Sequence, residues 1–205
     1  MKPKTPQNNE QTIVRMARSS GLLRAGDLLK KGIPTITLTR LVSAGKLERV
    51  ARGIYCIPNQ SISEHRSLAE AAIQMPQGVV CLLSALRIHE IGTQAPFEVW
   101  LAIPNNLRTP KLEHPVIRIV RMSDKAISAG LETINVDGIK VRVFNAAKTI
   151  VDCFKYRNQI GLDVALEALR EGWNKRQISI DELWHYAAIN RVTNVMRPYM
   201  EAITA

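Results

Sequence analysis

Hydroxyl side chains and one arginine are concentrated between residues 35 and 43, in a stretch with helical spacing. Leu38, Leu41 and Val42 recur at three- and four-residue intervals, which places them on one inward face. The residues left for solvent or a ligand are Thr35, Thr37, Thr39, Arg40 and Ser43, with partial covering of Thr37 allowed for. Small hydroxyls can approach bases and phosphates, and an arginine can bind guanine O6 and N7 together. The stretch therefore predicts contact with the major groove of DNA.

The elements around this stretch predict a helix-turn-helix. Residues 22–31 carry apolar side chains at helical spacing, and Gly32 breaks the pattern as a glycine after a helix C-terminus does. Pro34 is tolerated in the first turn of a second helix, where its missing N–H costs least. The second helix is expected to run to about Ala44 and to end at Gly45. In such motifs the second helix enters the major groove.

A hairpin with a basic tip is predicted directly after the two helices. Two strand-like runs, residues 47–51 and 54–57, flank Arg52-Gly53, which is the form of a wing. With an amphipathic helix over residues 8–20, these elements predict a winged helix-turn-helix domain over residues 1–58. The side chains expected on phosphate or in the minor groove are Lys46, Arg49 and Arg52. The alternative is a small helix–hairpin unit that serves only for packing.

The distribution of charge favours the DNA-binding interpretation. The chain has 205 residues and a formal net charge of +10. Residues 1–58 hold 11 Lys and Arg against three Asp and Glu, whereas residues 59–205 hold 17 against 15. Most of the excess positive charge therefore lies on the segment that the residue pattern assigns to DNA binding, as expected for a protein that binds a polyanion. A generally basic protein with solvated lysines would not show this segregation.

Three stretches of the chain resemble one known family. The runs GDLLKKGIP and LVSAGKLERVARGIYCIP, within residues 26–58, resemble the N-terminal domain of the antitoxins of bacterial abortive-infection type IV toxin–antitoxin systems, the AbiEi-like transcriptional regulators. The later run FNAAKTIVDCFKYR, and the order of elements around it, resemble the C-terminal half of that family. The resemblance is most specific over residues 26–58, where AGKLERVARGIY is the signature.

The resemblance implies a function that the periodicity and charge of the sequence do not indicate. It implies a repressor that binds inverted repeats in the double-stranded operator DNA of its own toxin–antitoxin operon. It also implies neutralisation of a nucleotidyltransferase-like toxin without a stable complex, a task associated with the C-terminal domain, within a phage-defence system. Inverted repeats suit a dimer or two monomers bound in succession, and the sequence has no heptad seam, so a monomer or weak dimer is expected.

Residues 59–205 are predicted to form a second domain, which makes the whole chain α+β. The polar run NQSIS at residues 59–63 marks the boundary. Strand-like runs at residues 78–83, 97–103, 116–122, 131–136 and 139–144 predict a small sheet, mainly antiparallel or mixed. Helical patterns cover residues 64–75, 84–91, 145–156, 161–173, 179–188 and 193–204. Asp137-Gly138 between the last two strands is a strong hairpin signal. Ser179, with Glu182 three residues later, predicts a capping box at the start of the helix over residues 179–188.

Composition limits the other function classes. No apolar run approaches the ~20 residues that a membrane-spanning helix needs, and residues 1–10 lack the apolar core of a secretory signal. Cys56, Cys81 and Cys153 lie far apart, with no CxxC and no Cys/His ligand spacing, which indicates buried thiols in a reducing cytoplasm. No metal or cofactor is expected, and no membrane association.

Catalytic candidates are weak, and no enzymatic activity is expected. A nuclease-like set would combine Glu98 with Lys111 and Glu113, but their spacing is loose. Lys148 and Asp152 share one helix face next to Arg142 and Lys155, as either a functional polar cluster or a simple helix ion pair. A second kind of function, a one-component regulator with a small-ligand site in its C-terminal domain, would need a pocket lined by Trp100.

Overall fold

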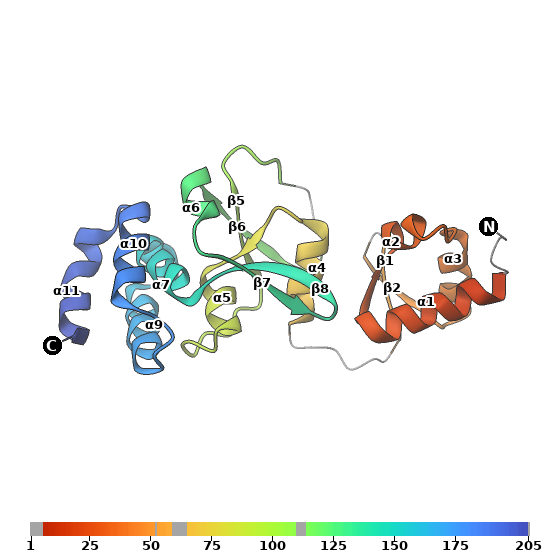
Figure 1. The fold of residues 1–205 in the computed structure, drawn as a ribbon, viewed down its shortest axis with the longest axis horizontal. Helices are drawn as coiled ribbons and strands as arrows, with labels where there is room; N and C mark the ends of the chain where they lie inside the picture. The colour runs from red at the N-terminus through yellow and green to blue at the C-terminus, as the bar shows by residue number, and fades with distance from the viewer. Residues whose placement is uncertain (1–5, 52, 59–64, 110–113, 205) are drawn as a thin grey trace. The chain divides into compact units, whose positions relative to one another are not determined.

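The computed structural model describes residues 6–51, 53–58, 65–109 and 114–204. The chain divides into two compact units. One unit comprises the described residues of 1–73 together with 135–140, and the other comprises those of 74–134 and 141–205. Most of the elements of both are labelled in Figure 1. The predicted domain boundary after residue 58 lies beside residues 59–64, outside the described part, and it stays a prediction.

The first unit contains the helices and the hairpin predicted for residues 1–58, together with a short strand that was not predicted. Its elements are α1 (Pro6–Ser20), β1 (Leu22–Arg24), α2 (Ala25–Lys30), α3 (Ile36–Ser43), β2 (Glu48–Ala51) and β3 (Ile54–Cys56). The three strands form one antiparallel sheet in the order β1-β3-β2. The hydrophobic core of the helices and sheet is formed by Ile13, Ala17, Leu23, Leu28, Ile33, Leu38, Leu41 and Leu47. This arrangement is winged-helix-like, as the sequence predicts.

The predicted start of the helix over residues 22–31 is wrong. Residues 22–24 form β1, which pairs with β3 through Leu22 opposite Cys56 and Leu23 opposite Tyr55. The strand buries Leu22 and Leu23 to 3% exposure each. Pairing with β3 gives the backbone of these residues hydrogen-bond partners that the first turn of a helix lacks. The helix therefore begins only at Ala25.

The glycines that were expected to end the two helices do so. The N–H of Gly32 donates to the Leu29 carbonyl and the next N–H donates to that of Leu28, with Gly32 at φ +72°. This is the hydrogen-bond pattern of a helix closed by a left-handed residue, a conformation that glycine adopts without strain. Gly45, at φ +65°, closes α3 with the same pattern, because its N–H donates to Val42 and the following N–H donates to Leu41.

The second unit is built on a mixed five-stranded sheet in the order β6-β5-β4-β8-β7. The strands are β4 (Val79–Val80), β5 (Val99–Pro104), β6 (Ile117–Met122), β7 (Leu131–Val136) and β8 (Ile139–Phe144). Strand β5 is parallel to β6 and antiparallel to β4, and β4 is parallel to β8. The short helices between the strands are α5 (Leu82–Ile88) and α6 (Asp124–Ser128). Helix α4 (Arg66–Gln74) precedes β4 and, except for its last residue, falls in the first unit. The predicted mixed sheet is confirmed.

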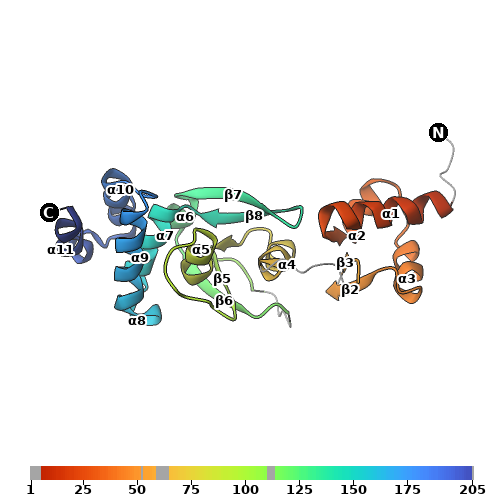
Figure 2. The same cartoon turned by 90° about the horizontal axis from the view of Figure 1, so that it is seen from below.

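The turn between β7 and β8 is the one that the sequence predicts. Asp137 and Gly138 both have positive φ, +49° and +76°. Two such residues in a two-residue connection define the type I′ turn that matches the twist of a hairpin. Figure 2 shows β7 and β8 side by side along their length.

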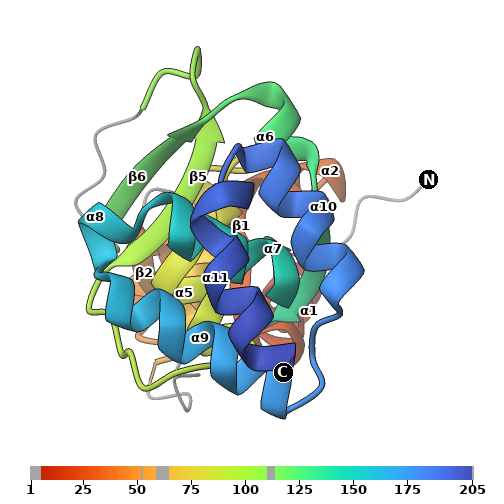
Figure 3. The same cartoon turned by 90° about the vertical axis from the view of Figure 1, so that its left-hand side faces the viewer.

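Helices form the C-terminal end of the second unit. They are α7 (Ala146–Lys155), α8 (Arg157–Ile160), α9 (Leu162–Asn174), α10 (Ile180–Asn190) and α11 (Thr193–Thr204). Helix α7 contacts both α9 and α10, and α11 contacts α9 and α10 as well (Figure 3). The predicted capping box is present, because the Ser179 hydroxyl accepts from the Glu182 N–H while the Glu182 carboxylate accepts from the Ser179 N–H. None of the described helices is long and apolar enough to cross a membrane.

Candidate nucleic-acid interface

Helix α3 presents a polar outer face. Residues 36, 39, 40 and 43 lie within an arc of about 100° around the helix axis, since each residue advances by about 100°. Thr39, Arg40 and Ser43 are all exposed on this arc. Thr35, directly before the helix, is exposed too, and its hydroxyl makes no capping hydrogen bond. Four of the five predicted α3 side chains are therefore accessible to a ligand along one side of the helix.

Thr37 does not share this face, which corrects its expected place at the interface. It is only 8% exposed and lies with Leu38 and Leu41 on the buried side of α3. The reason is angular. Residue 37 is about 100° from residue 36 and only about 40° from residue 41, so it turns toward the core. A side chain in this position supports packing of α3 rather than contact with a groove of DNA.

Ile36 takes the exposed position that was assigned to Thr37. Its side chain is 57% exposed, at the first residue of α3. The prediction from sequence missed it because an apolar residue is usually assigned to the core. The available signal was spacing, since Ile36 stands four residues before Arg40 and seven before Ser43. The outer face of α3 therefore combines one branched aliphatic side chain with hydroxyls and a guanidinium.

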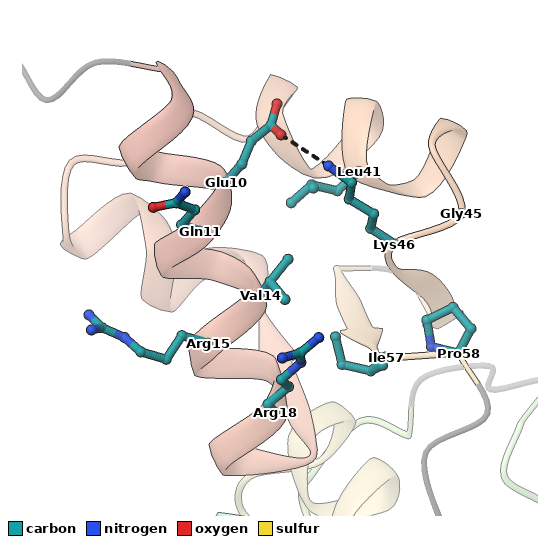
Figure 4. Close-up of a pocket in the computed structure, with 10 residues that line it drawn as sticks. All are labelled: Glu10, Gln11, Val14, Arg15, Arg18, Leu41, Gly45, Lys46, Ile57 and Pro58. Atoms are coloured by element: carbon teal, nitrogen blue, oxygen red, sulfur yellow. Dashed lines mark ion pairs between the residues drawn. The ribbon is translucent and has the colours of Figure 1, made fainter.

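The predicted basic residues beyond α3 are accessible where the structure describes them. Lys46 is exposed, with its Nζ 3.7 Å from the Glu10 carboxylate (Figure 4). Such a surface pair is worth at most about 1 kcal/mol, so it can exchange its partner for a phosphate. Arg49 on β2 is exposed, and its Nε donates to the Ala51 carbonyl at 3.4 Å. Arg52 at the hairpin tip lies outside the described residues.

A groove opens between α1 and the segment that follows α3. It has a volume of about 1080 Å³ and is lined by Glu10, Gln11, Val14, Arg15, Arg18, Leu41, Gly45, Lys46, Ile57 and Pro58. Figure 4 shows the aliphatic side chains of Val14, on α1, and Ile57, directly after β3, facing one another across it, with the Glu10–Lys46 ion pair at its edge. Because α1 and Lys46 line the same groove, the basic residues of α1 extend the positive surface of this unit.

The second unit contains a polar cluster that the sequence predicts only in part. The Lys148 Nζ donates to both carboxylate oxygens of Asp152, at 2.5 and 2.6 Å, and lies 4.3 Å from the centre of the Phe144 ring. The Asn190 amide of α10 donates to the same carboxylate at 2.5 Å. These polar groups are buried, with Lys148 at 0% and Asp152 at 1% exposure. Burial raises the pKa of the Asp152 carboxyl, and the charge of Lys148 opposes this rise.

The two other basic residues predicted near this pair are not part of it. Arg142 donates to the Gln77 carbonyl at 3.2 Å, and Lys155 is exposed at the end of α7. Asn190, which the sequence does not associate with the pair, completes it from 38 residues further along the chain. The cluster is closed to solvent. It therefore joins α7 to α10 inside the core and offers no surface to a substrate.

The residues of the catalytic alternative are not assembled by the described structure. The Glu98 carboxylate is 2.6 Å from the Arg118 guanidinium, while Lys111 and Glu113 lie outside the described residues. Within the described part of the chain, no three His, Cys, Asp or Glu residues are placed to hold a metal ion. Trp100 is 3% exposed, packs in the hydrophobic core and has the Arg118 guanidinium over its ring. A packed Trp100 argues against the ligand pocket that the second interpretation requires.

A basic winged-helix-like region with a polar outer helix face, followed by an α+β unit, is an arrangement typical of DNA-binding transcriptional regulators. Residues 11–58 match the family model described as the transcriptional regulator, AbiEi antitoxin. The N-terminal region of this chain is thus similar to the AbiEi antitoxin family of transcriptional regulators, which confirms the resemblance seen in the sequence over these residues. The match covers just under a quarter of the chain and includes the helix-turn-helix and the hairpin.

The fold extends to a solved structure over nearly the whole chain. The crystal structure of the RV2827C protein from Mycobacterium tuberculosis superposes with a TM-score of 0.58, covering 91% of this chain and 72% of that one. At 14% sequence identity this similarity shows a common fold. No curated protein matches the sequence of this chain.

Proposed function

We propose that the protein is a sequence-specific DNA-binding repressor and antitoxin. Its winged-helix-like region binds the operator of its own toxin–antitoxin operon, and its C-terminal region neutralises a nucleotidyltransferase-like toxin. The observation that carries the DNA-binding part is the outer face of α3, where Thr39, Arg40 and Ser43 are exposed together in the most basic segment of the chain. The antitoxin part rests on the family to which residues 11–58 are similar.

The proposed binding mode places α3 in the major groove of double-stranded DNA. Arg40 is the base-reading candidate, because a guanidinium can donate two hydrogen bonds to one guanine. Thr35, Thr39 and Ser43 lie along the same side of α3 and can reach bases or phosphates. Thr37 has no role at the groove, since its side chain is buried.

The hairpin and its flanks supply contacts that do not depend on sequence. Lys46 and Arg49 are exposed on the segment after α3, and Arg52 is placed by sequence at the hairpin tip. Cations on phosphate release condensed counterions, so binding should weaken steeply with salt. Operator half-sites arranged as inverted repeats would then be filled by two copies of the chain, either as a weak dimer or in succession.

Neutralisation of the toxin is assigned to the C-terminal region without a stable complex, as in type IV systems of phage defence. The buried Lys148–Asp152–Asn190 cluster is proposed to have only a structural role, because it links α7 and α10 in the core of that region. It does not face a partner. The surface that acts on the toxin pathway is therefore sought among exposed residues of the second unit.

The first test measures binding of the purified full chain to the DNA just upstream of its own gene, with scrambled DNA of equal length as the control. The salt series runs from about 50 to about 200 mM, the range over which phosphate contacts lose most affinity. A preference of about 100-fold or more, which approaches the low end of ~10³-fold for specific binders, supports an autoregulator. Equal binding to both fragments, or no binding, overturns the operator-binding proposal.

The second test separates repression from neutralisation. The full chain and its Arg40→Ala variant are each co-expressed with an adjoining gene that encodes a nucleotidyltransferase-like protein, and growth is measured beside activity of the operon promoter. We expect both to protect growth, while only the unmodified chain represses the promoter. Loss of growth by cells that express the unmodified chain would overturn the antitoxin part and leave the DNA-binding part standing.

A further inference from the structure

Ile36 is an aliphatic residue at an exposed position, so packing in the core does not explain its presence there. It is 57% exposed at the first residue of α3, although it is apolar. The neighbours that share its side of the helix are Thr39, Arg40 and Ser43, all polar and all exposed. The outer face of α3 therefore carries one apolar group among hydrogen-bonding groups. This is not the extended apolar patch that a protein partner would need.

We propose that Ile36 reads the C5-methyl group of a thymine in the major groove, and so contributes to operator specificity. The inference rests on the proposed DNA-binding function and adds the chemical class of base that one residue recognises. Residues near the N-terminus of a recognition helix contact base edges, and Ile36 begins α3. Thymine is the base that presents a methyl group there, so an aliphatic side chain distinguishes it from cytosine.

Arg40 and Ile36 would then contact bases that lie close together in one half-site. They are four residues apart on α3, so their side chains lie about one helical turn apart along the same side. A guanidinium recognises a pair of acceptors, whereas the branched sec-butyl side chain of isoleucine recognises an apolar group. The combination predicts a guanine and a thymine close together in each half-site, on the same or on opposite strands.

The experiment removes the methyl group from the DNA and the aliphatic group from the protein. The probe is the DNA just upstream of the gene, in which each thymine is replaced in turn by deoxyuridine, which lacks only the methyl. Affinities are measured for the unmodified chain and for Ile36→Ala. The matched control is Leu29→Ala, which truncates a side chain that is 58% exposed on α2, off the recognition helix.

We expect one deoxyuridine substitution in each half-site to weaken binding of the unmodified chain roughly fourfold, the effect of one buried methyl group. Ile36→Ala should bind the unsubstituted DNA less tightly and should be insensitive to that substitution. Leu29→Ala should keep the full sensitivity of the unmodified chain. Thermal unfolding should be nearly unchanged for both variants, because exposed truncations alter stability little.

Three outcomes overturn the inference in distinguishable ways. If the unmodified chain prefers its upstream DNA, but Ile36→Ala and each deoxyuridine substitution reduce affinity independently, then Ile36 does not contact a methyl group and the proposed function remains. If the unmodified chain shows no preference for its upstream DNA, the proposed function fails and this inference fails with it. Equal loss of sensitivity in Leu29→Ala would also contradict a specific role for Ile36.

Discussion

Lys148 and Asp152 form an ion pair that is almost completely removed from solvent. The Lys148 Nζ is 2.5 Å from Asp152 Oδ1, and the two side chains are 0% and 1% exposed. A helix pair at this spacing is worth only ~0.2–0.5 kcal/mol when it is solvated. Buried, the same two residues depend on each other, because an unpaired charge in the core is costly.

Removal of the lysine should therefore destabilise the protein strongly. Lys148→Met leaves the Asp152 carboxylate buried without a cation, and the expected loss is about 3–5 kcal/mol of unfolding free energy. Lys155→Met is the matched control, since it makes the same change at the exposed end of α7 and should stay within about 0.5 kcal/mol. Chemical denaturation measures both. Equal losses in the two variants would show that the buried pair contributes nothing particular.

The deficit of Lys148→Met should depend on pH. Burial raises the pKa of Asp152 in the folded chain, so the folded state holds this proton more tightly than the unfolded state does. Without the opposing charge of Lys148, the pKa of Asp152 in the folded chain rises further above its unfolded value. The stability deficit should be smallest below the raised pKa that Asp152 has in the unmodified folded chain, where both folded proteins hold the proton, and should increase as pH rises through that pKa. Denaturation at a series of pH values tests this, and a deficit that shrinks with rising pH would contradict the electrostatic cause.

Arg40 and Arg49 should respond differently to truncation. Arg40→Ala should cost about 1–3 kcal/mol on upstream DNA and little on scrambled DNA, because it removes a base contact. Arg49→Ala should weaken both alike and lower the salt slope by about 1, as loss of a phosphate contact does. Lys125→Ala, at an exposed lysine of α6, is the charge-matched control and should change neither. Indistinguishable losses for the two arginine variants would remove the base-reading role of Arg40.

The three cysteines should be unreactive in the folded protein. Cys56, Cys81 and Cys153 are free and buried, and burial raises the thiol pKa of Cys81 and of Cys153. A raised pKa keeps the reactive thiolate scarce, and burial blocks access to the sulfur. A thiol reagent at neutral pH should react with about three groups in denaturant and with almost none in the native state. Fast native reaction of any one thiol would contradict this arrangement.

The elements that sequence predicts best are those with local causes. Gly32 and Gly45 end their helices, Asp137-Gly138 turns a hairpin, and Ser179 with Glu182 caps α10, as expected. Each depends on a backbone conformation or a hydrogen bond within a few residues. The strand at residues 22–24 was not predicted, since it depends on pairing with β3, which is 30 or more residues away. The apolar pattern of these residues suits a helix and a strand equally.

The sequence by itself indicated the class of protein to which residues 11–58 are similar. The segregation of positive charge into residues 1–58, the spacing of the glycines and the AbiEi-like signature are properties of the chain that need no coordinates. Only the tertiary structure decided which side chains are accessible. It buried Thr37 and exposed Ile36, and it enclosed Lys148 and Asp152 with Asn190 from another helix. The reason is physical: spacing orients a side chain on its own element, but exposure depends on what packs against that element from elsewhere in the chain.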